Sequence, residues 1–458
     1  MDLRHPLPGR HALVVGAARS GVAAARLLRR HGLDVTVCDR RPEAEVGEAA
    51  RTLAADGVTC AWGRDDAGLL GEHEFLVWSP GIPIEHPLAV AARAAGRPVI
   101  GELELGYRAS RAPFVCITGT NGKSTTTDLV GALLRAAGRE VEVCGNIGRA
   151  VCEVAEQVSP TGLLVVEVSS FQLETVDRLR PSIATWLNLT PDHLDRHRTL
   201  AEYGAMKQRL FARQGEEDWA ILNADDPEVV SRRTGDGAAS EFSVARTVDE
   251  GAFFEDGAVM LAHRGGQERV LRREEIRLPG PHNLANVLAA LATVLPLEPA
   301  ADVLRKVLRE YRGLEHRLEP AGELAGVRFV NDSKATNTDS LRVALQSFPE
   351  PVVLIAGGRD KGQDFRPLAP LVKRSVRHLV LIGEGAETLA KAWPEVRQER
   401  AASLATAVRA AWEAAREVHA TVLLSPGCAS FDMFKDYEDR GRRFKEEVAR
   451  LAAKGVTA

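Results

Sequence analysis

Short apolar runs alternate with segments of helical periodicity along most of this chain. In the first hundred residues, HALVVG (11–16) is followed by the helically spaced segment 16–32, and further strand-like runs lie at 34–39 and 74–79. Apolar runs of about four to eight residues between turn residues are typical of buried strands, and their alternation with helices is typical of a parallel sheet. The pattern predicts a doubly wound α/β unit at the N-terminal end.

The same alternation continues in the rest of the chain. From near Pro113 to about Gly313, the strand-like runs 163–170 and 182–189 lead directly into polar residues. In the last third, four strand-like runs end in Gly or Asp: 329–332, 351–358, 378–385 and 421–427. Because ligands gather at the carboxyl edge of a parallel sheet, these strand ends are candidate binding positions.

We therefore predict an α/β protein of three domains, since 458 residues exceed what one core usually organises. The prediction is a Rossmann-like domain at 1–110, a central P-loop-type ATPase domain with a mostly parallel sheet at 111–313, and a Rossmann-like domain at 314–458.

Composition excludes several classes of partner. The formal net charge of -4 gives no basic footprint, so neither nucleic acid nor an anionic membrane is indicated. The sequence has no apolar run of membrane-spanning length, and MDLRHPLPGR lacks the hydrophobic core of a signal peptide. The six cysteines show no metal-type spacing and are too few for a disulfide framework. We expect a cytoplasmic protein that is not inserted in a membrane, and a monomer.

Lysine is rare, which draws attention to each one. Of the 59 lysine and arginine residues only ten are lysine. An ammonium group can lose its proton and react, whereas a guanidinium cannot. Half of the lysines fall in motif-like stretches: Lys123, Lys207, Lys334, Lys361 and Lys435.

The stretch FVCITGTNGKSTTTDL (114–129) reads as a strand, a glycine loop and a helix. Two residues separate Gly119 from the Gly-Lys-Ser of this loop, where the common P-loop has four. Backbone N–H groups and the helix dipole favour bound phosphate there, with Lys123 reaching the outer phosphates and Ser124 ligating Mg²⁺. The alternative is a glycine-rich turn with a solvated lysine.

The glycine pattern after the first strand is incomplete. Gly16 and Gly21 are present, but Ala18 occupies the middle position, where glycine lets the backbone approach a pyrophosphate. An NAD site is therefore disfavoured, and another nucleotide or a purely structural turn remain open.

Two residues near the predicted strand ends are candidates for chemistry. Glu167 interrupts an apolar run, which is costly unless the carboxylate binds a metal or pairs with a buried arginine. His193 follows the next strand as a metal or phosphate contact, or as a structural loop residue. Lys207 lies in a probable helix, where a surface lysine is the ordinary explanation. In the last segment, Lys361 suits an anionic amino acid, or is a solvated loop lysine.

Together these stretches resemble the Mur ligases, the ATP-dependent amide-forming enzymes of peptidoglycan precursor assembly. The resemblance covers essentially the whole chain and rests on SPGIP (79–83), TGTNGKST (118–125), GNIG (145–148), EVSSFQLE (167–174), DHLDRH (192–197), LPGPHNLAN (278–286), NDSKATN (331–337) and SPGCASFDMFKDYEDRG (425–441). The short phosphate loop is the family's own. NDSKATN and the SPGCAS segment resemble the D-glutamate-adding members more specifically.

The resemblance implies ATP-dependent addition of D-glutamate to UDP-N-acetylmuramoyl-L-alanine through an acyl phosphate, in cytoplasmic peptidoglycan precursor synthesis. It implies two Mg²⁺ ions and a CO₂-derived carbamate on Lys207. Closure of the third domain is expected, because water must be kept from the acyl phosphate.

The resemblance also assigns site residues, which fall into four groups. The catalytic group is Lys123, Glu167, His193 and Lys207, and the metal group is Ser124, Glu167, His193 and carbamylated Lys207. The implied ATP contacts are Gly119, Thr120, Asn121, Gly122, Lys123, Ser124, Thr125, Asn283, Asn286, Arg317, Asp332 and Lys334. The implied UDP-substrate contacts are Ser20, Asp39, Arg40, Arg41, Ser79, Gly81, Asn146 and His193. The implied D-glutamate contacts are Thr336, Lys361, Ser430, Phe431 and Tyr437, of which Tyr437 departs from the family's common phenylalanine.

Other functions fit fewer of these features. A nucleotide switch would need the phosphate loop but no pocket for an anionic amino acid. A dehydrogenase would use only the first domain. Within the superfamily, the L-alanine-adding enzyme and folylpolyglutamate synthase are the nearest competitors, and the SPGCASFDMF segment fits them less well.

Overall fold

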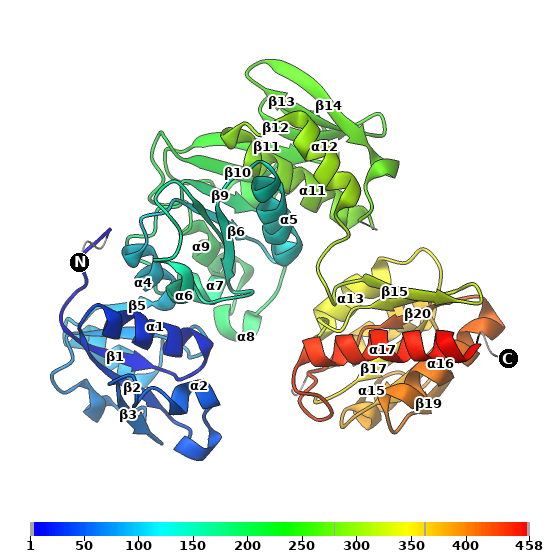
Figure 1. Ribbon diagram of the computed structural model, residues 1–458, viewed down its shortest axis with the longest axis horizontal. Coiled ribbons are helices and arrows are strands. Elements are labelled where there is room, and N and C mark those ends of the chain that lie inside the picture. The colour runs from blue at the N-terminus through cyan, green and yellow to red at the C-terminus, as the bar shows by residue number, and fades with distance from the viewer. Residues whose placement is uncertain (1–3, 279, 361–362, 456–458) are drawn as a thin grey trace. The chain divides into compact units, whose positions relative to one another are not determined.

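The computed structural model describes residues 4–278, 280–360 and 363–455 and contains three sheets (Figure 1). The chain divides into two compact units, Met1–Arg277 with Asn283–Tyr311, and Leu278–His282 with Arg312–Ala458. The first unit holds two of the sheets and the second unit holds one. The mixed α/β class with mostly parallel sheets is thereby confirmed, whereas the three domain boundaries remain a prediction.

The N-terminal sheet has five parallel strands in the order β3-β2-β1-β4-β5. Its strands are β1 His11–Val15, β2 Asp34–Asp39, β3 Thr59–Trp62, β4 Phe75–Trp78 and β5 Val99–Gly101. Its helices are α1 Arg19–Arg30, α2 Glu48–Arg51, α3 Pro87–Ala94 and α4 Glu102–Ala109. The central strands β1 and β4 are almost wholly buried, as parallel strands covered on both faces must be.

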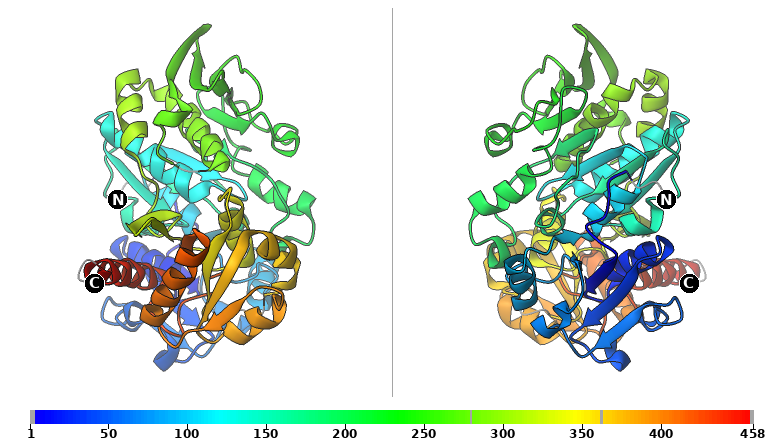
Figure 2. Two further views of the ribbon diagram at one scale, coloured as in Figure 1. Left: turned by 90° about the vertical axis from the view of Figure 1, so that its right-hand side faces the viewer. Right: turned by 90° about the vertical axis from the view of Figure 1, so that its left-hand side faces the viewer.

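The central sheet has nine strands in the order β14-β13-β12-β11-β10-β9-β6-β8-β7. They are β6 Phe114–Thr118, β7 Val141–Gly145, β8 Leu163–Glu167, β9 Ile183–Trp186, β10 Trp219–Asn223, β11 Ala238–Ser243, β12 Gly251–Glu255, β13 Ala258–His263 and β14 Gly266–Arg272. The associated helices are α5 Lys123–Ala136, α6 Val151–Val154, α7 Ser170–Leu173, α8 Leu194–His197, α9 Leu200–Gln208, α10 Pro227–Val230, α11 Pro281–Val294 and α12 Ala301–Glu310. Strands β12 to β14 form an antiparallel extension at one edge of the sheet, green in Figure 2.

The third sheet has the order β15-β16-β20-β17-β18-β19, with only β15 antiparallel to its neighbour. Its strands are β15 Glu319–Leu324, β16 Val327–Asn331, β17 Val352–Gly357, β18 Val376–Ile382, β19 Gln398–Arg400 and β20 Thr421–Leu424. Its helices are α13 Thr338–Gln346, α14 Ala369–Ser375, α15 Ala386–Ala392, α16 Leu404–Val418 and α17 Tyr437–Gly455.

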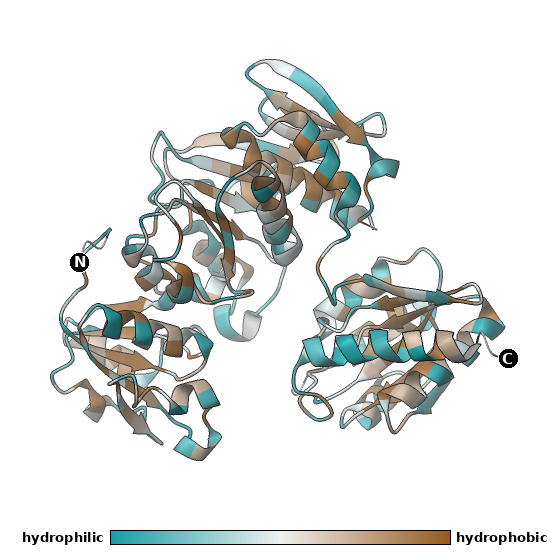
Figure 3. Ribbon diagram, in the orientation of Figure 1, coloured by the Kyte–Doolittle hydropathy of each residue, from teal (hydrophilic) through white to brown (hydrophobic). Residues whose placement is uncertain are grey.

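Hydropathy follows this layering. In Figure 3 the strands are predominantly brown, whereas α17 carries long hydrophilic stretches. In α17 the apolar Phe444 and Val448, four residues apart, are buried beside the third sheet, as expected for an amphipathic covering helix. Within the described ranges, none of the helices combines the length and apolarity needed to cross a lipid bilayer.

Candidate active site

The phosphate loop connects β6 to α5, as the sequence predicts. Gly122 lies just before α5 with φ of +85°, in the left-handed region that glycine adopts readily. A Cβ atom at this position would lie 2.2 Å from Oδ1 of Asn286. Backbone conformation and space therefore both require glycine here.

Asn188, which follows β9, holds the loop in shape. Its Oδ1 accepts hydrogen bonds from the N–H groups of Thr120 (3.0 Å) and Asn121 (2.8 Å), and its Nδ2 donates to the carbonyl of Asn121 (3.1 Å). These two loop amides are thus engaged by the protein itself. The amides of the first turn of α5, which have no partner within a helix, are the donors that remain for a phosphate.

Two of the ten lysines converge on one carbonyl oxygen in this loop. Nζ of Lys123 donates to the carbonyls of Gly119 (2.9 Å) and Thr120 (2.7 Å), and Nζ of Lys207 donates to the same Gly119 carbonyl (2.8 Å). Lys207 comes from α9, far along the chain, and is only 1% exposed. The explanation of Lys207 as a helix-surface lysine is therefore wrong.

The surroundings of Lys207 favour its uncharged amine. Burial lowers its pKa well below the ordinary value and the charge of Lys123 acts in the same direction, while Asp192 and Glu167 oppose the shift only in part. Nζ also lies 4.4 Å from the ring centroid of Tyr203. A neutral buried amine is a nucleophile, so this lysine can undergo chemistry that a surface lysine at neutral pH cannot.

Glu167 ends β8 and is 1% exposed. Its Oε1 accepts a hydrogen bond from Nδ2 of Asn146 (2.8 Å), and its Oε2 is buried with no hydrogen-bond partner among the residues that the structure describes. The alternative of an ion pair with a buried arginine is therefore wrong. A buried carboxylate oxygen without a partner is costly, and a bound cation would remove that cost.

His193 lies beyond β9 in a left-handed conformation, with φ of +52°. Its ring lies 4.8 Å from Phe171 and 6.2 Å from Tyr203, between centroids, and its Nε2 lies 3.5 Å from Oδ2 of Asp192. Since Tyr203 contacts both His193 and Lys207, the structure brings these two predicted residues to one region. Strand β6 pairs with β8 and β9, so their carboxyl ends carry Glu167, the phosphate loop and the His193 segment side by side.

Helix α11 adds two asparagines beside the loop. Nδ2 of Asn286 donates to Oδ1 of Asn283 (2.9 Å), and both side chains are buried. Because Asn286 packs against Gly122, the predicted nucleotide contacts of this helix do lie next to the phosphate loop.

In the N-terminal sheet, Asp39 ends β2 and closes the glycine turn. Its carboxylate accepts hydrogen bonds from the Ala17 amide (2.8 Å) and from Nε (2.9 Å) and Nη2 (2.7 Å) of Arg41. Burial raises the pKa of Asp39, but the hydrogen bonds from Arg41 and Ala17 outweigh this effect and lower it to about 2. Asp39 thus shapes the turn, and Arg41 is held by Asp39 in this structure.

This ion pair predicts a pH-dependent loss of stability in Asp39→Asn. With a folded pKa of about 2 and an ordinary value near 4, the stabilisation is present above about pH 4 and is lost as the pH falls through about 2. We expect the variant to lose about 2 kcal/mol in the free energy of unfolding at pH 7, and about half as much at pH 3.

Urea unfolding at the two pH values measures this difference. Asp34→Asn is the matched control, because Asp34 begins the same strand and its side chain is 74% exposed. An Asp39→Asn deficit that is equal at pH 7 and pH 3 would contradict the assignment.

The other predicted UDP-substrate residues border the same edge of the sheet. Oγ of Ser79 donates to the carbonyl of Gly16 (3.3 Å), and Ser20 lies in the first turn of α1. Nη2 of Arg19, also at the start of α1, donates to the carbonyls of Gly145 (3.1 Å) and Asn146 (3.3 Å). The loop that carries Asn146 is thereby tied to the N-terminal sheet. Arg40 and Gly81 are exposed.

In the second unit, the predicted nucleotide residues Arg317, Asp332 and Lys334 are close in space. The Leu318 amide donates to Oδ1 of Asp332 (3.2 Å), and the Lys334 amide donates to the carbonyl of His316 (3.0 Å). Burial raises the pKa of Asp332 to about 7, although the hydrogen bond from Ser425 and the charge of Arg317 oppose the shift.

The predicted D-glutamate residues are less uniform. Ser430 is buried, whereas the Phe431 side chain beside it is exposed. Thr336 and Tyr437 are half-buried, and Lys361 lies outside the described residues. The role of each of these residues remains a prediction.

Sequence reasoning missed two residues that organise the centre. Asn188 is a polar residue near the end of the apolar run 182–189. Its position at the end of a predicted strand was the available signal that it could contact the phosphate loop. No sequence signal indicated Tyr203, because its contacts with His193 and Lys207 depend on how α9 packs.

Comparisons with known proteins identify the family. Residues 10–101 match the Mur ligase MurD-like N-terminal domain, 117–294 the Mur ligase middle domain, and 316–428 the Mur ligase glutamate ligase domain. Curated relatives named UDP-N-acetylmuramoylalanine–D-glutamate ligase include one from Geobacter metallireducens, 45% identical over 97% of this chain and 98% of that protein. Another, from Pelotomaculum thermopropionicum, is 43% identical over 96% of this chain and 97% of that protein.

A solved structure supports the same fold. The UDP-N-acetylmuramate–alanine ligase of Thermotoga maritima aligns with a TM-score of 0.59 at 17% identity, over 96% of this chain and 99% of that one. At this identity the similarity concerns the fold alone. The three domain matches and the full-length relatives carry the assignment, and the chain belongs to the Mur ligase family.

Proposed function

We propose that this protein is a UDP-N-acetylmuramoylalanine–D-glutamate ligase, which joins D-glutamate to UDP-N-acetylmuramoyl-L-alanine with conversion of ATP to ADP and phosphate. The observation that carries the proposal is the meeting of three features at one sheet edge: the short phosphate loop, buried Lys207, and the Glu167 Oε2 that has no hydrogen-bond partner among the described residues. Relatives over 40% identical along nearly the whole chain bear this name. The reaction belongs to the cytoplasmic stage of peptidoglycan precursor synthesis.

The chemistry proceeds in two steps. A carboxylate oxygen of the UDP substrate attacks the γ-phosphorus of ATP, which releases ADP and gives an acyl phosphate. The amine of D-glutamate then attacks the acyl carbon, and phosphate leaves with the carboxylate oxygen as a proton is lost. Lys123 neutralises charge on the transferred phosphoryl group, and the helix α5 amides bind its oxygens.

The residues at the sheet edge fit divalent cations. Ser124, Glu167, His193 and a carbamate on Lys207 would hold two Mg²⁺ ions, with the buried Oε2 of Glu167 as the anchoring ligand. When bound, Mg²⁺ screens the crowded phosphate oxygens and polarises the γ-phosphoryl group.

The carbamate would form on Lys207 itself. The unprotonated amine adds to CO₂ and loses one proton, so that an anionic oxygen ligand replaces a neutral amine. The lowered pKa supports this step, because only the neutral amine reacts. Arginine could not form the carbamate, because its guanidinium group does not lose its proton in proteins.

Binding of the substrates would use residues at the other strand ends. We propose Ser20, Ser79, Gly81 and Asn146 as contacts of the diphosphate and sugar. Asp39, Arg40 and Arg41 would serve the uridine end. Arg317, Asp332 and Lys334 would bind the nucleotide, and the SPGCASF segment with Thr336 and Tyr437 would bind D-glutamate.

Phosphate release tests the proposal. The protein is incubated with UDP-N-acetylmuramoyl-L-alanine, ATP and Mg²⁺, and D-glutamate is compared with L-glutamate, L-alanine and a diamino acid. We expect release only with D-glutamate. Release with another amino acid would keep the ligase chemistry but overturn the proposed specificity, and no release with any of them would overturn the proposed function.

A further inference from the structure

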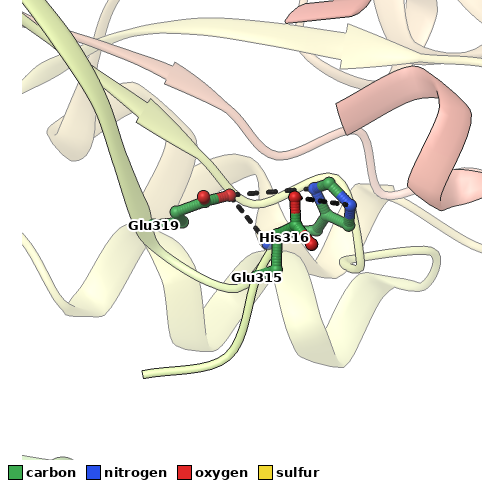
Figure 4. A group of neighbouring side chains, drawn as sticks. All are labelled: Glu315, His316 and Glu319. Carbon is green, nitrogen blue, oxygen red and sulfur yellow. Dashed lines mark hydrogen bonds and ion pairs between the residues drawn. The ribbon is translucent and has the colours of Figure 1, made fainter. Parts of the chain in front are cut away.

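A compact group of ionisable side chains lies at the start of the third sheet. Glu315, His316 and Glu319 bring their ligand atoms within 4.8 Å of one another, an arrangement that could hold a metal ion (Figure 4). However, Nζ of Lys445 already donates to Oε1 of Glu315 (2.6 Å) and to Oε1 of Glu319 (2.9 Å). The position that a cation would occupy is taken by an ammonium group of the protein, so the group is a charge network.

The imidazole of His316 is also engaged. Its Nδ1 lies 3.0 Å from Nδ2 of Asn331, which also donates to Oε2 of Glu319 (3.0 Å) and contacts the carbonyl of Gly441 (3.3 Å). Because an amide nitrogen only donates, Nδ1 of His316 is the acceptor in its contact with Nδ2 of Asn331. A Cβ atom on Gly441 would lie 2.2 Å from Nδ1, so α17 packs directly on the ring.

The network surrounds a backbone turn that presents Arg317. The residues on either side, His316 (φ +65°) and Leu318 (φ +45°), both adopt the left-handed conformation, which is unfavourable for residues with a side chain. Two such residues in one turn persist only where their surroundings fix them. The backbone on both sides of Arg317 is therefore held in a conformation that His316 and Leu318 would not favour by themselves.

Carboxylates fix the turn on both sides of Arg317. Oε2 of Glu319 accepts a hydrogen bond from the His316 amide (2.9 Å), and Oδ1 of Asp332 accepts one from the Leu318 amide (3.2 Å). The guanidinium of Arg317 itself has no hydrogen-bond or ion-pair partner within the described part of the chain. Its charge contributes to lowering the pKa of Asp332 against the effect of burial.

Lys445 is the link between this turn and the C-terminal helix. Its Nζ donates to Oε1 of Glu319, and Oε2 of the same carboxylate accepts the hydrogen bond from the His316 amide. A displacement of α17 would therefore move the carboxylate that fixes the turn. Glu315, the second partner of Lys445, lies directly before the turn. The side chain of Lys445 is only 29% exposed, which strengthens its two ion pairs relative to surface pairs.

We propose that Lys445 is a positioning residue for ATP binding, acting through Glu319 and the left-handed turn on Arg317. The inference rests on the proposed function, in which Arg317 contacts the nucleotide. The C-terminal helix is then a part of the nucleotide site, although none of its residues needs to touch ATP.

The test compares steady-state kinetics of Lys445→Met with wild type. We expect the KM for ATP to rise about tenfold, because small displacements of a positioned group have effects of this size or larger. The KM values for D-glutamate and UDP-N-acetylmuramoyl-L-alanine should change by less than about twofold, and Lys445→Arg should recover most of the ATP affinity. Lys391→Met is the matched control, since Lys391 is a surface lysine of the same unit whose one ion pair within the described residues is with Glu387 in its own helix.

A double variant shows whether the effect passes through Arg317. In an Arg317→Ala background, Lys445→Met should add less than about twofold to the KM for ATP, because coupled residues are not additive. An unchanged KM for ATP in Lys445→Met, or an equal increase in both backgrounds, would overturn the inference. If Lys445→Met does not fold, Glu315→Gln removes one of the two ion pairs and should raise the same KM by a smaller factor, and no rise would overturn the inference. Wild-type activity with D-glutamate in the same assay shows that the proposed function stands whichever result is obtained.

Discussion

Replacement of Lys123 by alanine is expected to lower ADP formation by about 10²-fold or more, the effect typical of a group that stabilises transition-state charge. The structure places Lys123 Nζ on the Gly119 and Thr120 carbonyls of the phosphate loop. Both acceptors belong to the phosphate loop, so the ammonium group lies where the loop would hold a phosphate. Initial rates of ADP formation at saturating substrates measure the loss, which should fall mainly on kcat.

Lys306→Ala is the control for Lys123→Ala. Lys306 is an exposed lysine on α12 of the same unit, and its loss should leave the rate within about twofold of wild type. Both variants should melt near the wild-type temperature. If Lys123→Ala retained more than about a tenth of the wild-type kcat, Lys123 could not have the proposed role.

The second large effect is expected for Lys207→Ala, which should also lose about 10²-fold or more in ADP formation. The reason differs from that for Lys123, because the missing group would be an anionic oxygen ligand and not a positive charge. Formate or acetate should therefore restore part of the activity of Lys207→Ala, by supplying carboxylate oxygens in the space left by the side chain.

Lys207→Arg separates the two explanations. It supplies a positive charge and a hydrogen-bond donor at the Gly119 carbonyl but cannot be carbamylated, so it should be as inactive as Lys207→Ala. Normal ADP formation by Lys207→Arg would contradict the carbamate. Failure of formate and acetate to raise the activity of Lys207→Ala above that of a chloride control would count against it as well.

The sheet architecture could be predicted mainly where strands are buried on both faces. Strands β8, β9 and β17 read as continuous apolar runs because neighbouring layers cover both of their sides. The antiparallel strand β14, GQERVLR, is largely exposed and polar, so its sequence carries no such run. Strand β14 was missed for this reason.

In the candidate site too, some features could be predicted from the sequence and others could not. The phosphate loop could be predicted, because its glycines, Lys123 and Ser124 are neighbours in sequence and the loop geometry is local. The burial of Lys207 could not, since α9 has no strongly apolar face and the lysine is enclosed by segments distant in sequence. The contacts of Asn188 and Lys445 also join residues that are far apart in sequence, and a single sequence does not show which distant residues come into contact.

The most direct measurement of the proposed reaction follows an oxygen atom from substrate to phosphate. UDP-N-acetylmuramoyl-L-alanine with oxygen-18 at both carboxylate oxygens is incubated with ATP, Mg²⁺ and D-glutamate, and the amide and the released phosphate are analysed by mass spectrometry. An acyl phosphate predicts one oxygen-18 atom in the phosphate for every amide formed. Unlabelled phosphate alongside the amide, or the absence of any amide with D-glutamate, would contradict the account.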